Sequence, residues 1–174
     1  MAADISDLLT ARIRDVPDYP QPGILFKDIT PLLADGAAFA ATIDALALGY
    51  EGVTTVAGIE ARGFILAAPV ACVLGAGFVP VRKQGKLPAE TYAQSYELEY
   101  GVATLEVHTD AFHPGDQVLI VDDVLATGGT AAATAELIQR SGATVAGIVV
   151  LLELEFLHGR GKLTGLPIRS LLTV

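Results

Sequence analysis

The sequence predicts an α/β fold in which a mostly parallel central sheet is flanked by helices. Short apolar runs alternate with segments of helical periodicity along the chain, and the sequence contains no internal repeat. Two of the runs, residues 118–121 and 145–152, are continuously apolar, as expected for strands covered on both faces. We therefore expect ligands at the carboxyl ends of these strands.

The other elements are expected in a regular order. Apolar side chains recur at helical spacing in four segments, so we expect helices over residues 5–14, 37–50, 65–74 and 130–140. Strands are expected over residues 53–57, 78–81 and 102–107, with a strand or buried tail over 168–174. Residues 82–100 fit neither period, and a connection of this length predicts a functional lid without structure of its own.

Composition and charge exclude several classes of protein. A chain of 174 residues with 52% hydrophobic residues is expected to fold as one domain, residues 1–174. The net charge of −9 repels polyanions, so nucleic acid is not an expected partner. Residues 64–81 carry no charge but contain Pro69 and Gly75, which favours a buried helix and strand over a membrane span.

The single cysteine and the first residues predict a cytoplasmic location. Cys72 cannot form an internal disulfide, and its apolar neighbours predict a small buried side chain. The chain begins with acidic rather than basic residues, so no export signal is expected.

The strongest chemical signal follows the apolar strand at residues 118–121. Residues 126–130 read Ala-Thr-Gly-Gly-Thr and lead directly into a predicted helix. Glycines there permit positive φ and close ligand approach, so several N–H groups and the helix N-terminus can converge on one phosphate. The lysine of a nucleoside triphosphate loop is missing. The segment therefore predicts a cradle for a phosphate monoester.

Asp122 and Asp123 precede this cradle. Adjacent carboxylates repel each other, but they are well placed to accept hydrogen bonds from the vicinal diol of a ribose or to face a cation. Two bare aspartates would favour a solvated acidic turn, with Thr127 or Thr130 capping the helix. The neighbouring phosphate cradle reverses that preference.

These residues resemble the phosphoribosyl-pyrophosphate motif of the type I phosphoribosyltransferases. The string Asp-Asp-Val-Leu-Ala-Thr-Gly-Gly-Thr at residues 122–130 is similar to that of the adenine-specific members, and residues 22–31, 58–64, 81–88 and 96–101 agree with further family motifs. The resemblance implies the family's fold, with a small hood and a flexible lid loop. It also implies a homodimer and the joining of adenine to phosphoribosyl pyrophosphate, which forms AMP and releases pyrophosphate.

The resemblance also assigns residues to substrates. Phosphoribosyl pyrophosphate is expected to bind Arg62, Arg82, Lys83, Lys86, Asp122, Asp123, Ala126, Thr127, Gly128, Gly129 and Thr130. Adenine is expected to bind Leu25, Phe26 and Lys27, with Phe26 stacking on the purine and the backbone of Leu25 reading its edge. The family pattern also implies a non-proline cis peptide in the loop that contains Glu60 and Arg62.

The lid is expected to carry the proton chemistry. Glu99 matches the family's lid glutamate, which is proposed to act near adenine N7, and Tyr100 would close over the ring with it. Mg²⁺ is expected to be held by substrate oxygens and waters, with no ligand set from the protein. The three histidines show no metal spacing and are interpreted as surface or packing residues.

Two other functions stay open at this point. The first is transfer to another purine, although a methyl group at Ala126, where the 6-oxopurine enzymes place an aspartate, argues against hypoxanthine and guanine. The second is a non-catalytic regulator that binds phosphoribosyl pyrophosphate. Such a regulator usually carries a DNA-binding element or a basic face, and this acidic chain has neither.

Overall fold

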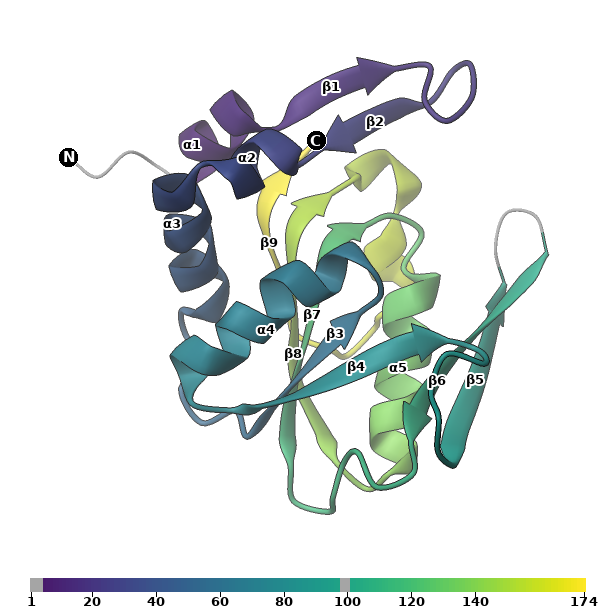
Figure 1. The fold of residues 1–174 in the computed structure, drawn as a ribbon. Coiled ribbons are helices and arrows are strands. Elements are labelled where there is room, and N and C mark those ends of the chain that lie inside the picture. Colours follow the sequence, from purple (N-terminus) through teal and green to yellow (C-terminus); the bar gives the residue numbers. More distant parts are fainter. Residues whose placement is uncertain (1–4, 98–100) are drawn as a thin grey trace.

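A seven-stranded sheet forms the centre of the structure, a computed structural model that describes residues 5–97 and 101–174 (Figure 1). Its strands are β3 (Thr55–Ile59), β4 (Gly77–Lys83), β5 (Thr91–Glu97), β6 (Val102–His108), β7 (Gln117–Leu125), β8 (Thr144–Glu153) and β9 (Ile168–Thr173). Their order is β5-β6-β4-β3-β7-β8-β9. Strands β4, β3, β7, β8 and β9 run parallel, whereas β6 is antiparallel to β4 and β5. The predicted mostly parallel α/β sheet is confirmed.

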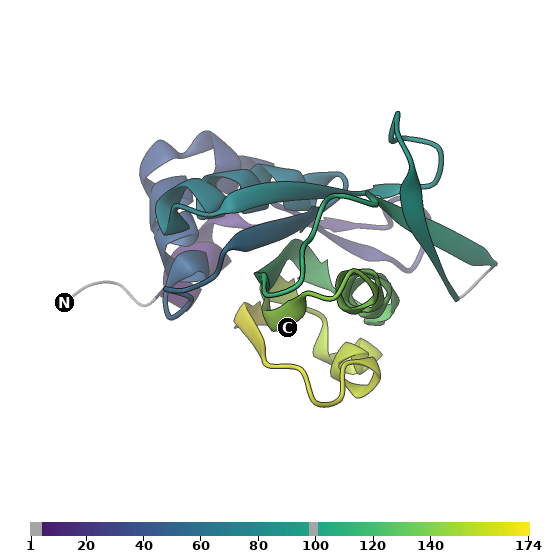
Figure 2. The same cartoon turned by 90° about the horizontal axis from the view of Figure 1, so that it is seen from below.

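Helices cover both faces of the sheet (Figure 2). On one side lie α1 (Ile5–Arg12), α2 (Thr30–Ala34), α3 (Gly36–Ala47) and α4 (Arg62–Leu74), and on the other lies α5 (Gly129–Arg140). Leu119 and Val121 belong to the core on the α4 side, while Val118 and Ile120 belong to the core on the α5 side. Period-2 alternation on a strand buried on both faces thus explains the continuous apolar run of β7.

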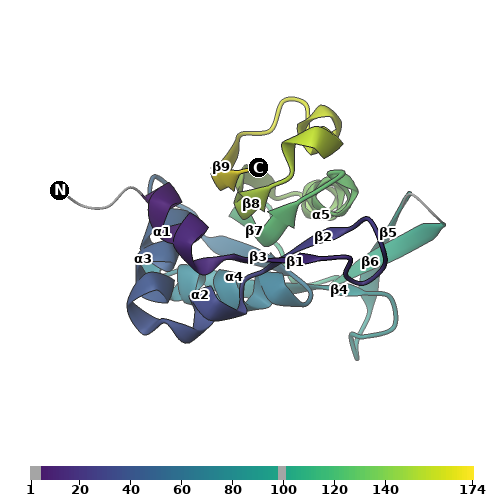
Figure 3. The same cartoon turned by 90° about the horizontal axis from the view of Figure 1, so that it is seen from above.

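A two-stranded hairpin projects above the carboxyl ends of the parallel strands (Figures 1 and 3). It consists of β1 (Arg14–Pro17) and β2 (Leu25–Asp28), which pair antiparallel. Two short 3₁₀ turns, η1 (Glu155–Leu157) and η2 (Gly159–Lys162), follow β8 at the same edge of the sheet. This hairpin, residues 14–28, is called the hood. The hood and the two turns face each other across the carboxyl ends of the strands.

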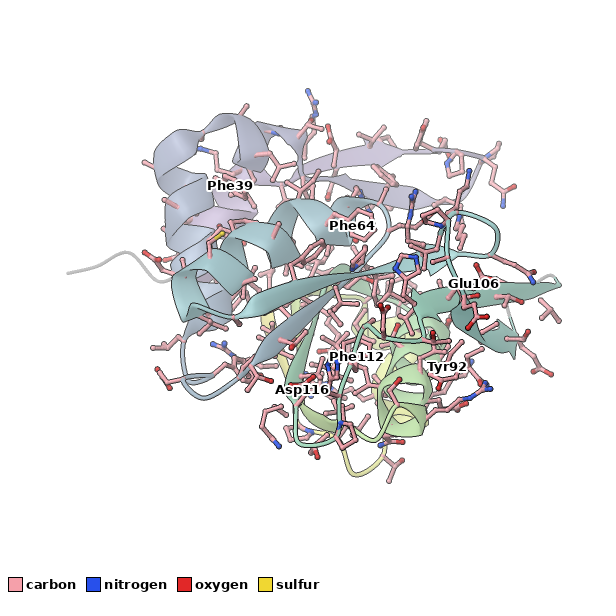
Figure 4. All side chains as sticks on the ribbon, turned by 60° about the horizontal axis from the view of Figure 1, so that its bottom comes forward. Phe39, Phe64, Tyr92, Glu106, Phe112 and Asp116 are labelled. Carbon is pink, nitrogen blue, oxygen red and sulfur yellow. The ribbon has the colours of Figure 1, made fainter. Side chains whose placement is uncertain are left out.

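The prediction of an unstructured connection over residues 82–100 is wrong for most of its length. Strand β4 continues to Lys83, and β5 pairs with β6 over all seven of its residues. Tyr92 (labelled in Figure 4) packs against the core on the α5 side, as does Tyr96 on the same face of β5. The Arg140 guanidinium lies 4.7 Å from the Tyr92 ring centroid. Alternate tyrosines give this segment a buried face, which is why it forms a strand.

Cys72 is exposed, so the expectation of a buried thiol is wrong. The buried face of α4 carries Leu66, Ala67, Val70 and Ala71, and the next position along the helix turns toward solvent. Among the helices of the described residues, none is long and apolar enough to cross a membrane.

Candidate active site

The predicted cradle lies at the carboxyl end of β7, where the chain turns into α5. Gly128 has φ of 79° and forms the left-handed N-cap of the helix. The backbone N–H groups of residues 127–130 donate to no acceptor among the described residues. Unpaired amides at a helix N-terminus attract anions, so the loop has the geometry expected for a phosphate site.

Both glycines of the cradle are in close contact with other segments. A Cβ on Gly128 would collide with the backbone carbonyl of Gly159, in the turns that follow β8. A Cβ on Gly129 would lie 2.9 Å from Cδ2 of Tyr96, on β5. Glycine is therefore required on both sides of the loop by the protein's own packing, which fixes the loop between η2 and the β5–β6 hairpin.

The two aspartates lie within β7 and share one cation. Arg62 Nη2 lies 2.6 Å from Asp123 Oδ2, in an ion pair without the alignment of a hydrogen bond. Burial raises the pKa of Asp122 well above its usual range, and the charge of Asp123 raises it further. A Cβ on Gly63 would lie 2.7 Å from Asp122 Oδ1, so glycine lets the start of α4 approach the pair.

Arg62 joins this acid pair to the hood. Its guanidinium carbon lies 4.9 Å from the ring centroid of Phe26, and its Nη1 is 3.4 Å from the carbonyl oxygen of Lys27. The peptide bond between Glu60 and Ala61, just before Arg62, is cis, as the family resemblance implies. One side chain thus contacts both the acidic strand end and the β2 strand above it.

The basic turn at the end of β4, which carries Arg82, Lys83 and Lys86, is held by two acidic side chains. Arg82 donates through Nε to Glu60 at 3.0 Å, and Glu60 also accepts from the backbone of Lys83 at 3.1 Å. The buried Glu106 accepts from the Gly85 amide at 2.9 Å (Figure 4). The Arg82 charge is therefore paired within the protein, whereas the ammonium groups of Lys83 and Lys86 form no ion pair with the described residues.

An apolar cleft of about 570 Å³ opens beside the cradle. Its lining comes from three segments: Gly23, Ile24, Leu25 and Lys27 of the hood, Ala126 and Thr127 of the cradle, and Leu154, Phe156, Leu157 and Val174 near the C-terminus. A planar heteroaromatic base fits such a site, because its walls are largely aliphatic and its floor adjoins polar loop groups.

Comparison with known proteins identifies the family. A model of the phosphoribosyl transferase domain matches residues 26–164. Adenine phosphoribosyltransferase of Thermobifida fusca is 63% identical over 177 residues and covers 100% of both chains, and that of Acidothermus cellulolyticus is 63% identical over 99% of this chain and 98% of its own. This chain belongs to the adenine phosphoribosyltransferase family.

Solved structures of adenine phosphoribosyltransferases have the same fold. The enzyme of Thermoanaerobacter pseudethanolicus superposes with a TM-score of 0.93 at 52% identity and covers 97% of this chain and 99% of its own. The Saccharomyces cerevisiae enzyme, solved with adenine and an imino-altritol bisphosphate, gives 0.93 at 39% identity with the same coverages. The type I phosphoribosyltransferase fold predicted from the motifs is confirmed.

The structure places the residues predicted to bind adenine on both faces of β2. Leu25 and Lys27 line the cleft, whereas the Phe26 ring contacts Arg62 and lies 5.1 Å, edge-on, from the ring of Tyr19. The Lys27 ammonium forms an ion pair with Asp15 at 2.6 Å, across the hairpin. Stacking of Phe26 on the purine stays a prediction.

Sequence reasoning missed the C-terminal wall of the cleft and could not reach the tip of the lid. Leu154, Phe156 and Leu157 directly follow β8, and the rule that ligands gather at strand ends was the signal that could have found them. Glu99 and Tyr100 lie outside the described residues, between the ends of β5 and β6.

Proposed function

We propose that this protein transfers the 5-phosphoribosyl group of phosphoribosyl pyrophosphate to N9 of adenine, which yields AMP and pyrophosphate. The observation that carries the proposal is that Ala126 and Thr127 line the apolar cleft and also form one side of the phosphate cradle. Base and sugar phosphate can therefore bind side by side, with Asp122 on the side of the cradle. Effective catalysis of bond formation between two substrates needs such juxtaposition.

The cradle holds the 5′-phosphate in this proposal. The free amides of residues 127–130 and the hydroxyl of Thr127 donate to its oxygens, and the α5 N-terminus adds a favourable partial charge. Asp122 and Asp123 accept hydrogen bonds from the ribose hydroxyls. The sugar is thereby oriented with its anomeric carbon toward the cleft.

At the anomeric carbon, the bond to the pyrophosphate oxygen breaks, a bond to N9 forms, and adenine gives up its imidazole N–H proton. Pyrophosphate leaves with the electron pair, and positive charge develops on the ribosyl ring. The acid pair stabilises that charge, while the unpaired ammonium groups of Lys83 and Lys86 are candidates to bind the leaving group. Arg82 contributes by anchoring the turn, because its own charge is paired with Glu60.

Magnesium fits this arrangement as an ion held through the substrate. Among the described residues, no three His, Cys, Asp or Glu side chains are grouped to hold a metal. Asp123 Oδ2 is buried and already lies 2.6 Å from Arg62 Nη2, so the ion is proposed to bind pyrophosphate oxygens and water rather than this carboxylate. Bound there, Mg²⁺ would supply charge neutralisation for the leaving group.

Adenine binds in the cleft against the hood. The backbone of Leu25, which lines the cleft, is proposed to donate to N1 and to accept from the 6-amino group, a pairing that a 6-keto group reverses. Leu157 and Phe156 provide the opposite, apolar wall.

The base preference tests the function directly. The purified protein is given phosphoribosyl pyrophosphate, Mg²⁺ and adenine, hypoxanthine, guanine or xanthine, and nucleotide formation is followed. We expect kcat/KM for adenine to exceed that for each 6-oxopurine by about 100-fold or more. Preference for a 6-oxopurine would assign another purine, and tight substrate binding without turnover would indicate a regulator.

Glu99 is proposed to assist proton movement at the base once the lid closes. Glu99→Gln should lower kcat about 100-fold with little change in either KM, because an amide cannot transfer the proton. Glu97→Gln is the matched control, since Glu97 is an exposed acid two residues away on β5. Equal steady-state kinetics of the two variants would remove the catalytic role from Glu99.

The homodimeric state and the cytoplasmic location stay predictions. Support for a dimer comes from the family, in which some basic residues at the positions of Arg82, Lys83 and Lys86 reach across the dimer interface. Sedimentation of the purified chain tests this expectation.

A further inference from the structure

Residues 154–162 contact both the base cleft and the phosphate cradle. Phe156 and Leu157, in η1, form the C-terminal wall of the base cleft. Two residues after Leu157, the Gly159 backbone packs against Ala126 and Gly128 in the phosphate cradle. The position of this short segment therefore determines both the width of the cleft and the shape of the cradle.

An ion pair between the buried Glu153 and the half-exposed Arg160 anchors the segment to the sheet. Arg160 donates through Nε and Nη2 to the two carboxylate oxygens of Glu153, each at 2.7 Å. Ser170, on β9, donates to the same carboxylate at 2.7 Å, and Arg160 Nη1 reaches the Ile168 carbonyl at 3.2 Å. Glu153 is only 5% exposed, and the Arg160 hydrogen bonds hold the pKa of its carboxyl below the usual range.

The ion pair itself does not belong to the substrate site. Neither Glu153 nor Arg160 lines the base cleft or the cradle; both face a separate hollow behind the segment, together with Glu155 and His158. The backbone on the site side is held more simply, by the Leu154 amide on the Leu125 carbonyl at 3.0 Å and the Glu155 amide on the Val174 carbonyl at 2.9 Å. Arg160 adds the side-chain hydrogen bonds that tie η2 to β8 and β9, and the buried Leu163, directly after η2, packs in the core on the α5 side.

We propose that Arg160 is a positioning residue that sets the base cleft and the phosphate cradle together through residues 154–162. The inference rests on the proposed function of the site. A planar guanidinium with two parallel hydrogen bonds fixes orientation as well as distance. Its loss leaves the Glu153 carboxylate buried without its cation and frees η2 to move away from Gly128. Both adenine and phosphoribosyl pyrophosphate are then expected to bind more weakly.

The test compares Arg160→Met with Arg12→Met. Arg12, on α1, forms an ion pair with Asp35 at 3.0 Å and lines neither the cleft nor the cradle, so this variant controls for the loss of an arginine. Arg160→Met should raise the KM of adenine and the KM of phosphoribosyl pyrophosphate together, each about 10-fold, whereas Arg12→Met should keep wild-type constants. Kinetics are measured well below the thermal midpoint of each variant.

The joint change in two KM values distinguishes positioning from mere stabilisation. A lower thermal midpoint with both KM values unchanged would overturn the proposal, and so would a rise confined to one substrate. If Arg160→Met does not fold, Arg160→Lys and Ser170→Ala decide, because each keeps a charge pair but weakens its geometry; both should raise the two KM values by about 3-fold. Failure of the wild-type protein to convert adenine would count against the proposed function instead.

Discussion

Replacement of Gly128 by alanine should lower kcat/KM for phosphoribosyl pyrophosphate by about 100-fold or more. Two effects act at this position. The residue has φ of 79°, where an L side chain costs about 1–2 kcal/mol, and the added Cβ would collide with the Gly159 backbone. The cradle must therefore shift, and its amides lose their convergence on the phosphate.

Gly165→Ala separates the two effects. Gly165 has φ of 83°, but a Cβ there meets nothing within 4 Å. This variant should lose only the φ contribution, about 1–2 kcal/mol of the free energy of unfolding, and retain nearly full activity. Steady-state kinetics and thermal unfolding of both variants provide the measurement. Full activity of Gly128→Ala would mean that the loop does not need its contact with η2.

The cradle could be predicted from sequence because its information is local. Residues 118–130 contain the apolar strand, the acid pair, the glycines and the helix start in one continuous string. The alternation of helices and strands was likewise sufficient for the sheet and for the helices on its two faces. Where one segment carries both the geometry and the chemistry, spacing alone is informative.

Other features depended on contacts between distant segments. The hood strands are four residues each, and β1 contains two charges and a proline, so no periodicity marks them. Strand β5 did carry a signal, since Tyr92 and Tyr96 alternate with exposed residues, but the polar composition suggested a loop. The pairing of Arg82 with Glu60 joins positions 22 residues apart, and only the sheet brings them together.

The cleft wall shows the same dependence on tertiary structure. Leu154, Phe156 and Leu157 reach the base site because β8 lies beside β7 in parallel register, with Leu125 opposite Glu153. Apolar residues after a buried strand usually indicate packing alone. Their role follows from the strand order, which the sequence pattern does not determine.

Conversion of Asp122 to asparagine should stabilise the unliganded protein at neutral pH while weakening its use of phosphoribosyl pyrophosphate. Burial and the adjacent Asp123 raise the pKa of Asp122, so ionising this carboxyl costs more in the folded than in the unfolded state. In the pH range between the unfolded and folded pKa values, the native state binds more protons, and stability falls as pH rises. Asparagine removes that cost and keeps an oxygen that can accept from the Asp123 amide, as Oδ1 does at 2.9 Å.

The sign of this effect depends on pH and on which aspartate is changed. Below the ordinary carboxyl range both the folded and the unfolded wild type are protonated at Asp122, so the stability gain from Asp122→Asn should vanish there.

Asp123→Asn should instead destabilise the protein at neutral pH, because Arg62 loses its partner at 2.6 Å. Denaturant unfolding of the three proteins from acid to neutral pH, with kinetics at neutral pH, checks both signs. We expect each variant to lose about 10-fold or more in kcat/KM for phosphoribosyl pyrophosphate, since each replaces a carboxyl oxygen that can accept from a ribose hydroxyl with an amide nitrogen that cannot. A wild-type kcat/KM in Asp122→Asn would show that Asp122 does not bind the ribose. A loss of stability in the same variant at neutral pH would mean that contacts other than those with Asp123 and Arg62 stabilise the buried carboxylate.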